Sequence, residues 1–202
     1  MQPFGRILGL RLVCFTFGAC LALGQSRPIS DQTGNSEADL PALMKQDFGP
    51  NFTLPAKFPT PMITGDFDGD GVEDAAIVVD IKDPFPDSYE YKYKVADPYH
   101  EFFGFGNPSE TAAFTARESR NSHSIVVIFG AGADNWRTAD PKAKFVLVNV
   151  PFDTVETGRM LVKKNKPPIF VIKAVEAELM DANVFWDAKR KRWRWEPGAT
   201  AD

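Results

Sequence analysis

The sequence has almost no cysteine and almost no histidine, and both shortages limit its chemistry. Its two cysteines, Cys14 and Cys20, both lie in the first 24 residues, so the chain after them has no disulfide bond and no thiol nucleophile. Its two histidines are His100 and His123, and neither accompanies a serine motif such as G-x-S-x-G. We therefore expect no catalytic site, and we interpret His123, which opens a predicted strand, as a satisfied polar side chain.

The sequence also lacks an apolar run long enough to cross a membrane. The run after Arg11 is about a dozen residues long, whereas a spanning helix needs about 20. This run, the arginines before it and the small residues before Gln25 predict a signal peptide over residues 1–24. The alternative is a lipoprotein processing site at Cys20. Polar residues 25–38 predict a flexible linker, and we expect a secreted or periplasmic bacterial protein.

Positive charge is scarce as well. The chain has 23 basic and 27 acidic residues, and the predicted signal peptide removes two arginines and no acid. The mature chain would then carry 21 basic and 27 acidic side chains, a net charge of −6. This balance argues against nucleic acid as a partner.

No internal repeat is visible, so the pattern of apolar residues predicts one α+β domain over residues 39–196 and a disordered tail over 197–202. A short helix is expected over 39–48, capped by Asp39, because Leu40, Leu43 and Met44 fall on one helical face. Strands are expected over 75–79, 124–130, 144–150, 168–179, 183–187 and 191–195. Those after residue 123 read as an antiparallel meander. In 191–195, the alternation of Trp193 and Trp195 with Arg192 and Arg194 predicts one covered face and one solvated face. Residues 81–122 read as an irregular insertion with a short helix near 109–114.

The stretch GDFDGDGVED, residues 65–74, spaces oxygen ligands as a calcium-binding loop does. The carboxylates of Asp66, Asp68, Asp70 and Asp74 fall at loop positions 1, 3, 5 and 9. Val72 at position 7 offers its backbone carbonyl. Gly71 at position 6 permits the sharp turn. Calcium tolerates such a loose oxygen shell, whereas magnesium does not, and no sulfur or imidazole stands nearby for zinc or copper. An ordinary Asp-Gly hairpin turn is the alternative, but it leaves four repelling carboxylates unexplained.

The residues around the loop exclude a helix-loop-helix calcium site. Position 12 holds Ile77 instead of glutamate, and Pro59 and Pro61 prevent an entering helix. The sequence therefore predicts a strand, a calcium loop and a second strand.

GDFDGDGVEDAAIVV, followed later by SIVVIFGAGADNW, resembles one unit of the FG-GAP or VCBS type, the calcium-loop repeat of integrin-like propellers and of many secreted bacterial proteins. The resemblance implies that the four aspartates and the Val72 carbonyl hold the ion. It does not imply a propeller, because one unit alone cannot bury its faces.

Three other features have two interpretations each. FFGFGNP (102–108) lacks the lysine of a phosphate loop and reads as an aromatic loop at a sheet edge. The basic run 189–192 reads as a charged hairpin tip, or as a docking patch for an acidic polymer or an anionic surface. The aromatic side chains of the insertion read as packing, or as a carbohydrate or peptide groove: Tyr89, Tyr91, Tyr93, Tyr99, Phe102, Phe103 and Phe105.

These observations predict an exported, non-catalytic calcium-binding domain that acts as a binding or structural module of the cell envelope or exterior. A calcium-dependent secreted hydrolase using His100 is the alternative.

Overall fold

The computed structural model describes residues 40–111, 123–176 and 181–198. The chain divides into two units, 1–34 and 35–202, and all described residues belong to the second. The predicted signal peptide and linker, the expected cap at Asp39 and residues 199–202 lie outside the described part. Strand β9 runs to Pro197, one residue past the predicted end of the domain.

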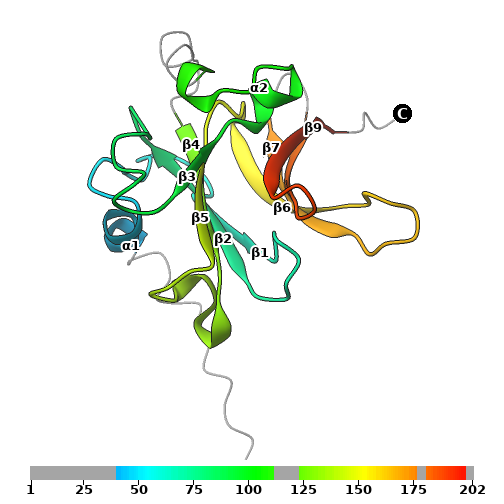
Figure 1. Ribbon diagram of the computed structural model, residues 1–202, viewed down its shortest axis with the longest axis horizontal. Helices are drawn as coiled ribbons and strands as arrows, with labels where there is room; N and C mark the ends of the chain where they lie inside the picture. The colour runs from blue at the N-terminus through cyan, green and yellow to red at the C-terminus, as the bar shows by residue number, and fades with distance from the viewer. Residues whose placement is uncertain (1–39, 112–122, 177–180, 199–202) are drawn as a thin grey trace, which may run out of the picture. The chain divides into compact units, whose positions relative to one another are not determined.

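Five strands form the first sheet, and all neighbours are antiparallel except the last pair (Figure 1). Their spatial order is β1 (Met62–Gly65), β2 (Asp74–Asp80), β4 (His123–Phe129), β5 (Ala143–Leu147) and β3 (Lys94–Ala96). The central strands β2 and β4 are buried along nearly their whole length. Continuous β-branched runs such as AIVV and SIVVIF favour this position, because both faces of a central strand are covered.

Four strands form the second sheet as an antiparallel meander: β6 (Thr154–Met160), β7 (Ile169–Val175), β8 (Ala182–Asp187) and β9 (Arg192–Pro197). The expectation of one meander from residue 124 onward is therefore wrong for β4 and β5, which join the first sheet. Local sequence does not reveal this, because a strand's partners depend on pairing across the chain. The predicted covered face of β9 is confirmed, since Trp193 and Trp195 are buried.

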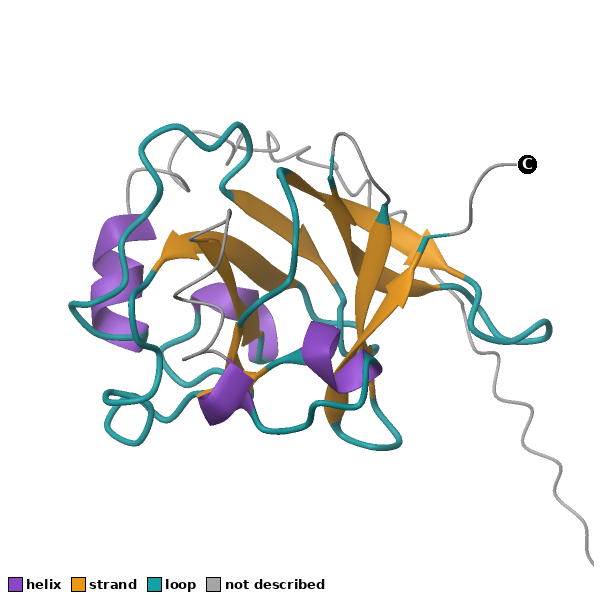
Figure 2. Ribbon diagram, turned by 90° about the horizontal axis from the view of Figure 1, so that it is seen from above, coloured by secondary structure: helices purple, strands orange, loops and turns teal. Residues whose placement is uncertain are grey.

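The first sheet packs on both faces. Ala75, Ile77 and Val79 of β2 contact the cluster that includes helix α1 (Leu40–Asp47), while Ala76 and Val78 contact the cluster shared with the second sheet. Figure 2 shows α1 at the left of the first sheet and the second sheet at the right. Burying each Val or Ile contributes about 1.5–3 kcal/mol to folding, so β2 is anchored from both sides.

Helix α1 confirms the predicted short helix. Leu40, Met44 and Phe48 are buried at a spacing of four residues, which places them on one face. The amides of Phe48 and Gly49 both donate to the Met44 carbonyl, and Gly49 has φ +104°. This left-handed conformation ends the helix in the way that glycine favours.

The predicted irregular insertion contains more structure than expected. It includes β3, which pairs with β5 in parallel, and helix α2 (Pro98–Phe102), capped by the Asp97 carboxylate. Residues 108–111 are helical, and the rest of the helix predicted near 109–114 lies outside the described residues. A 3-10 helix, η2 (Gly132–Arg137), follows β4.

Candidate metal centre

The aspartate-rich loop joins two paired strands. Strands β1 and β2 are antiparallel, and Gly65 faces Asp74 in their last pair. Residues 66–73 therefore form the connection, and Asp74 already belongs to β2. The chain forms the strand, loop and strand that the sequence predicts, and calcium binding by the loop stays a prediction.

Three of the predicted ligands lie close together. Asp66, Asp68 and Asp74 each have a carboxylate oxygen within 4.8 Å of the oxygens of the other two. Oxygens bound to one calcium ion at about 2.4 Å lie at most about 4.8 Å apart, because the ion stands between them. The three side chains are thus spaced as ligands of one ion would be, and carboxylates are ligands that calcium prefers.

The Asp66 carboxylate organises the loop backbone. One oxygen accepts the amides of Gly69 (2.8 Å) and Asp70 (3.0 Å), and the other accepts the amide of Gly71 (3.0 Å). Gly71 has φ +87°, which a residue with a side chain rarely adopts. The glycine predicted from the spacing therefore serves the turn that points amides at the first carboxylate.

The Asp74 carboxylate lies at the buried bottom of the site. Its residue is 0% exposed, and it accepts the amides of Phe67 (2.7 Å), Asp68 (3.2 Å) and Gly130 (2.8 Å). The pKa of Asp74 is raised to about 7: burial is the largest cause, the amide hydrogen bonds partly oppose it, and the nearby Asp68 charge adds to it. A buried carboxylate in this setting gains from a cation beside it.

Gly130 permits the close approach of β4 to the loop. A Cβ atom on Gly130 would lie 2.4 Å from the Glu73 carbonyl oxygen, so no larger residue fits without a backbone shift. The Glu73 side chain also accepts the Trp136 indole N–H at 3.3 Å. The stretch IFGAGADNW therefore contacts the loop directly, although residues 81–122 separate the two in sequence.

Asp70 is not part of this group of three carboxylates. Its carboxylate pairs with the Lys142 ammonium at 2.9 Å, and the same ammonium lies 2.5 Å from Asp68. The hydrogen bond from Lys142 lowers the pKa of Asp70, and both carboxylates raise the pKa of Lys142. Sequence reasoning missed Lys142, because it lies 72 residues from Asp70 in a turn without any recognisable motif.

Val72, the predicted carbonyl ligand, is held in the loop by its own amide, which donates to Asp70 at 2.8 Å. The ligand role of its carbonyl stays a prediction.

Both histidines pair with aspartates. His100 Nδ1 lies 3.0 Å from the carboxylate of Asp97, which is only 5% exposed and also accepts Thr111 and Asn149. His123 Nδ1 lies 2.5 Å from Asp80 on the neighbouring strand. His123 opens β4 as expected.

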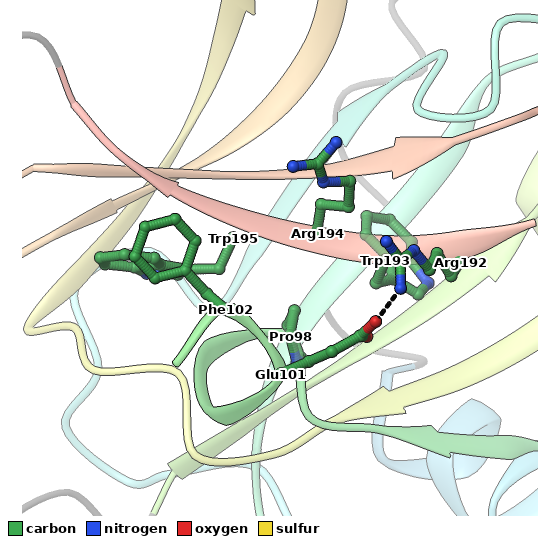
Figure 3. A pocket seen from close by; sticks show the side chains of 7 residues that line it. All are labelled: Pro98, Glu101, Phe102, Arg192, Trp193, Arg194 and Trp195. Atoms are coloured by element: carbon green, nitrogen blue, oxygen red, sulfur yellow. Dashed lines mark hydrogen bonds and ion pairs between the residues drawn. The ribbon is translucent and has the colours of Figure 1, made fainter. Parts of the chain in front are cut away.

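The aromatic residues of the insertion do not form one groove. Tyr93 packs on Phe48 beside α1, whereas the aromatic rings near α2 contact Trp195 of β9. A cavity of about 290 Å³ lies between α2 and β9, lined by Pro98, Glu101, Phe102, Arg192, Trp193, Arg194 and Trp195 (Figure 3). Figure 3 shows Phe102 against Trp195 at one end and the Glu101–Arg192 ion pair at the other. FFGFGNP thus lies at the edge of the second sheet, as the sequence predicts.

None of the described helices has the length and apolar composition of a membrane span. No protein-family model, curated protein or solved structure matches the chain. The resemblance of the loop to an FG-GAP or VCBS unit therefore stays a prediction from the sequence.

Proposed function

We propose that the chain is an exported, non-catalytic calcium-binding domain in which the ion stabilises the fold, and that it serves as a binding or structural module of the cell envelope or exterior. The observation that carries the proposal is the convergence of Asp66, Asp68 and Asp74 within 4.8 Å. Three carboxylates this close repel one another unless a cation stands among them.

The loop is tied to the core, which supports a stabilising role for the ion. Asp74 begins β2, whose next five residues are buried on both sides of the first sheet. Ordering of the loop and ordering of β2 are therefore coupled, and an ion that binds only the folded chain stabilises it by mass action. A dissociation constant of about 10⁻⁴ M would add about 1.4 kcal/mol at millimolar calcium.

Calorimetric titration of the purified protein with calcium, and thermal melts with calcium or chelator, test this proposal. We expect a heat of binding and a melting temperature that calcium raises by a few degrees. Asp68→Asn should abolish both effects, and Asp70→Asn should weaken them less, because Asp70 faces Lys142. Asp134→Asn, an exposed acid outside the loop, is the matched control. Identical wild-type melts without any heat of binding would leave the aspartates as an acidic turn.

Export is tested separately by intact-mass spectrometry of the protein from its native host. The proposal expects an amino terminus at Gln25. A lipid-modified terminus at Cys20 would contradict simple cleavage and place the protein on a membrane.

A calcium-dependent hydrolase is the second candidate, and one observation favours it. The buried Asp97 carboxylate lies 3.0 Å from His100 Nδ1, and a carboxylate in this position orients an imidazole for general base catalysis. Ester, glycoside and phosphoester substrates test it, with His123→Ala as the control for His100→Ala because both histidines pair with an aspartate. Robust turnover lost only in His100→Ala would replace the non-catalytic proposal.

A further inference from the structure

Two turns leave the second sheet at the same end. Val184 of β8 pairs with Ile172 of β7. From this pair β8 runs three residues on to Asp187, and β7 begins three residues earlier, at Ile169. The β6–β7 connection and the β8–β9 turn therefore emerge at one level of the meander. Figure 1 draws the first as a gold loop and the second in red, both at the lower right of this sheet.

These two turns concentrate positive charge on an otherwise acidic chain. Residues 159–168 and 187–192 contain eight of the 23 basic residues and one of the 27 acidic residues. The remainder then holds 15 basic and 26 acidic side chains. We call this part the basic end; its basic residues are Arg159, Lys163, Lys164, Lys166, Lys189, Arg190, Lys191 and Arg192.

Few of these cations are neutralised by the protein. Arg190 pairs with Asp187 and Arg192 with Glu101, while the Arg159 guanidinium lies 4.2 Å over the Phe170 ring. Within the described ranges, five lysines of the basic end have no ion pair with a carboxylate: Lys163, Lys164, Lys166, Lys189 and Lys191. Their charge is therefore available to an external anion.

The β6–β7 loop also exposes aliphatic side chains beside its lysines. Leu161 is 58% exposed and Val162 is 50% exposed, and Lys163 and Lys164 follow them directly. Figures 1 and 2 both show this loop extending beyond the strands, away from the body of the sheet. An aliphatic pair on a projecting basic loop matches the interfacial region of a bilayer, where apolar groups are buried below charged headgroups.

We propose that the basic end is a docking surface for a bilayer of anionic phospholipids, with Leu161 and Val162 entering the interface and the lysines contacting headgroup phosphates. A soluble polyanion would use the lysines but would leave the aliphatic pair in water, so the pair favours lipid. This inference goes beyond the calcium proposal and rests on different residues. Either proposal can therefore fail without the other.

Co-sedimentation of the purified protein with phospholipid vesicles tests the inference. A calcium chelator is present throughout. We expect binding to vesicles of equimolar phosphatidylcholine and phosphatidylglycerol, and little binding to phosphatidylcholine alone. Each lysine near an anionic surface strengthens binding about fivefold, so Lys163→Gln/Lys164→Gln should weaken it about 25-fold. Leu161→Ser/Val162→Ser should weaken it at least about tenfold, because burial of methylene groups is lost.

The exposed lysines Lys45 and Lys82 lie outside the basic end, so Lys45→Gln/Lys82→Gln is the charge-matched control and should bind like wild type. Thermal melts verify that each variant is folded. Absent binding, or equal binding to both vesicle types, would overturn the proposal. If Leu161→Ser/Val162→Ser binds the vesicles as well as wild type does, the proposal is overturned in favour of a polyanion-binding patch that does not insert into the bilayer.

Discussion

Replacing Lys142 by methionine should strengthen calcium binding by the aspartate loop. The Lys142 ammonium lies 2.5 Å from Asp68 and 2.9 Å from Asp70, so a cation of the protein already stands at the loop. The two carboxylates raise the pKa of Lys142, which keeps it charged at neutral pH. A calcium ion bound to Asp68 would therefore bind against this charge.

The distances set the size of the effect. A calcium ion lies about 2.4 Å from a ligand oxygen, and the Lys142 nitrogen lies 2.5 Å from an oxygen of Asp68. The two cations would thus be about 5 Å apart. Coulomb's law in water gives about 1.7 kcal/mol at this separation, or about fifteenfold in the dissociation constant. The lysine side chain is 48% exposed but that of Asp68 is only 4% exposed, so the dielectric constant of water gives a lower limit of the effect.

Calorimetric titration of wild type, Lys142→Met and Lys142→Arg at low salt measures the effect. We expect tighter calcium binding in Lys142→Met, wild-type affinity in Lys142→Arg, and a smaller difference at high salt because ions screen exposed charges. Without calcium, Lys142→Met should melt at a lower temperature than wild type, since Asp68 and Asp70 lose their counter-charge. Unchanged or weaker binding in Lys142→Met would refute the placement of the ion at Asp68.

Three further predictions concern the scaffold, and urea unfolding measures each. Lys144→Met should destabilise the domain by about 3 kcal/mol, because Asp47, 6% exposed, loses its cation; Asp47→Leu/Lys144→Met should recover most of this loss. Gly130→Ala should cost about 1–3 kcal/mol, since its Cβ would meet the Glu73 carbonyl oxygen; a cost near zero would mean that β4 and the loop separate easily. Burial raises the pKa of Tyr93 above its ordinary value of 10. The unfolded chain therefore loses this proton first, and stability should fall by about 1.4 kcal/mol per pH unit above about pH 10. Tyr93→Phe should remove that part of the slope, and equal slopes would contradict the assignment.

Patterns within a few residues predicted the local elements. The spacing of Leu40 and Met44 predicted α1, the run from Ala75 to Val79 predicted β2, and alternation in β9 predicted its buried tryptophans. Each pattern repeats at the period of its own element, so no knowledge of distant partners was needed.

Features that depend on distant pairing escaped prediction. Strand β3 is only three residues long and exists because it pairs with β5. At the candidate metal centre, spacing identified the aspartates and the turn glycine. It could not show that Asp70 faces Lys142, or that Gly130 supplies an amide to Asp74, because both partners approach from β4 and the chain beyond it.

The hydrogen bond from Gly130 to Asp74 also imposes an order on the maturation of the loop. Its two residues are 56 positions apart in the chain. At a synthesis rate of about 5–20 residues per second, a nascent chain holds Asp74 for about 3–11 s before Gly130 is made. During that interval the β1–β2 hairpin lacks β4, and the Asp74 carboxylate lacks one of its three amide donors. Under the calcium proposal, the loop therefore acquires its complete set of amide donors to Asp74 only after Gly130 has been made and β4 has joined its sheet.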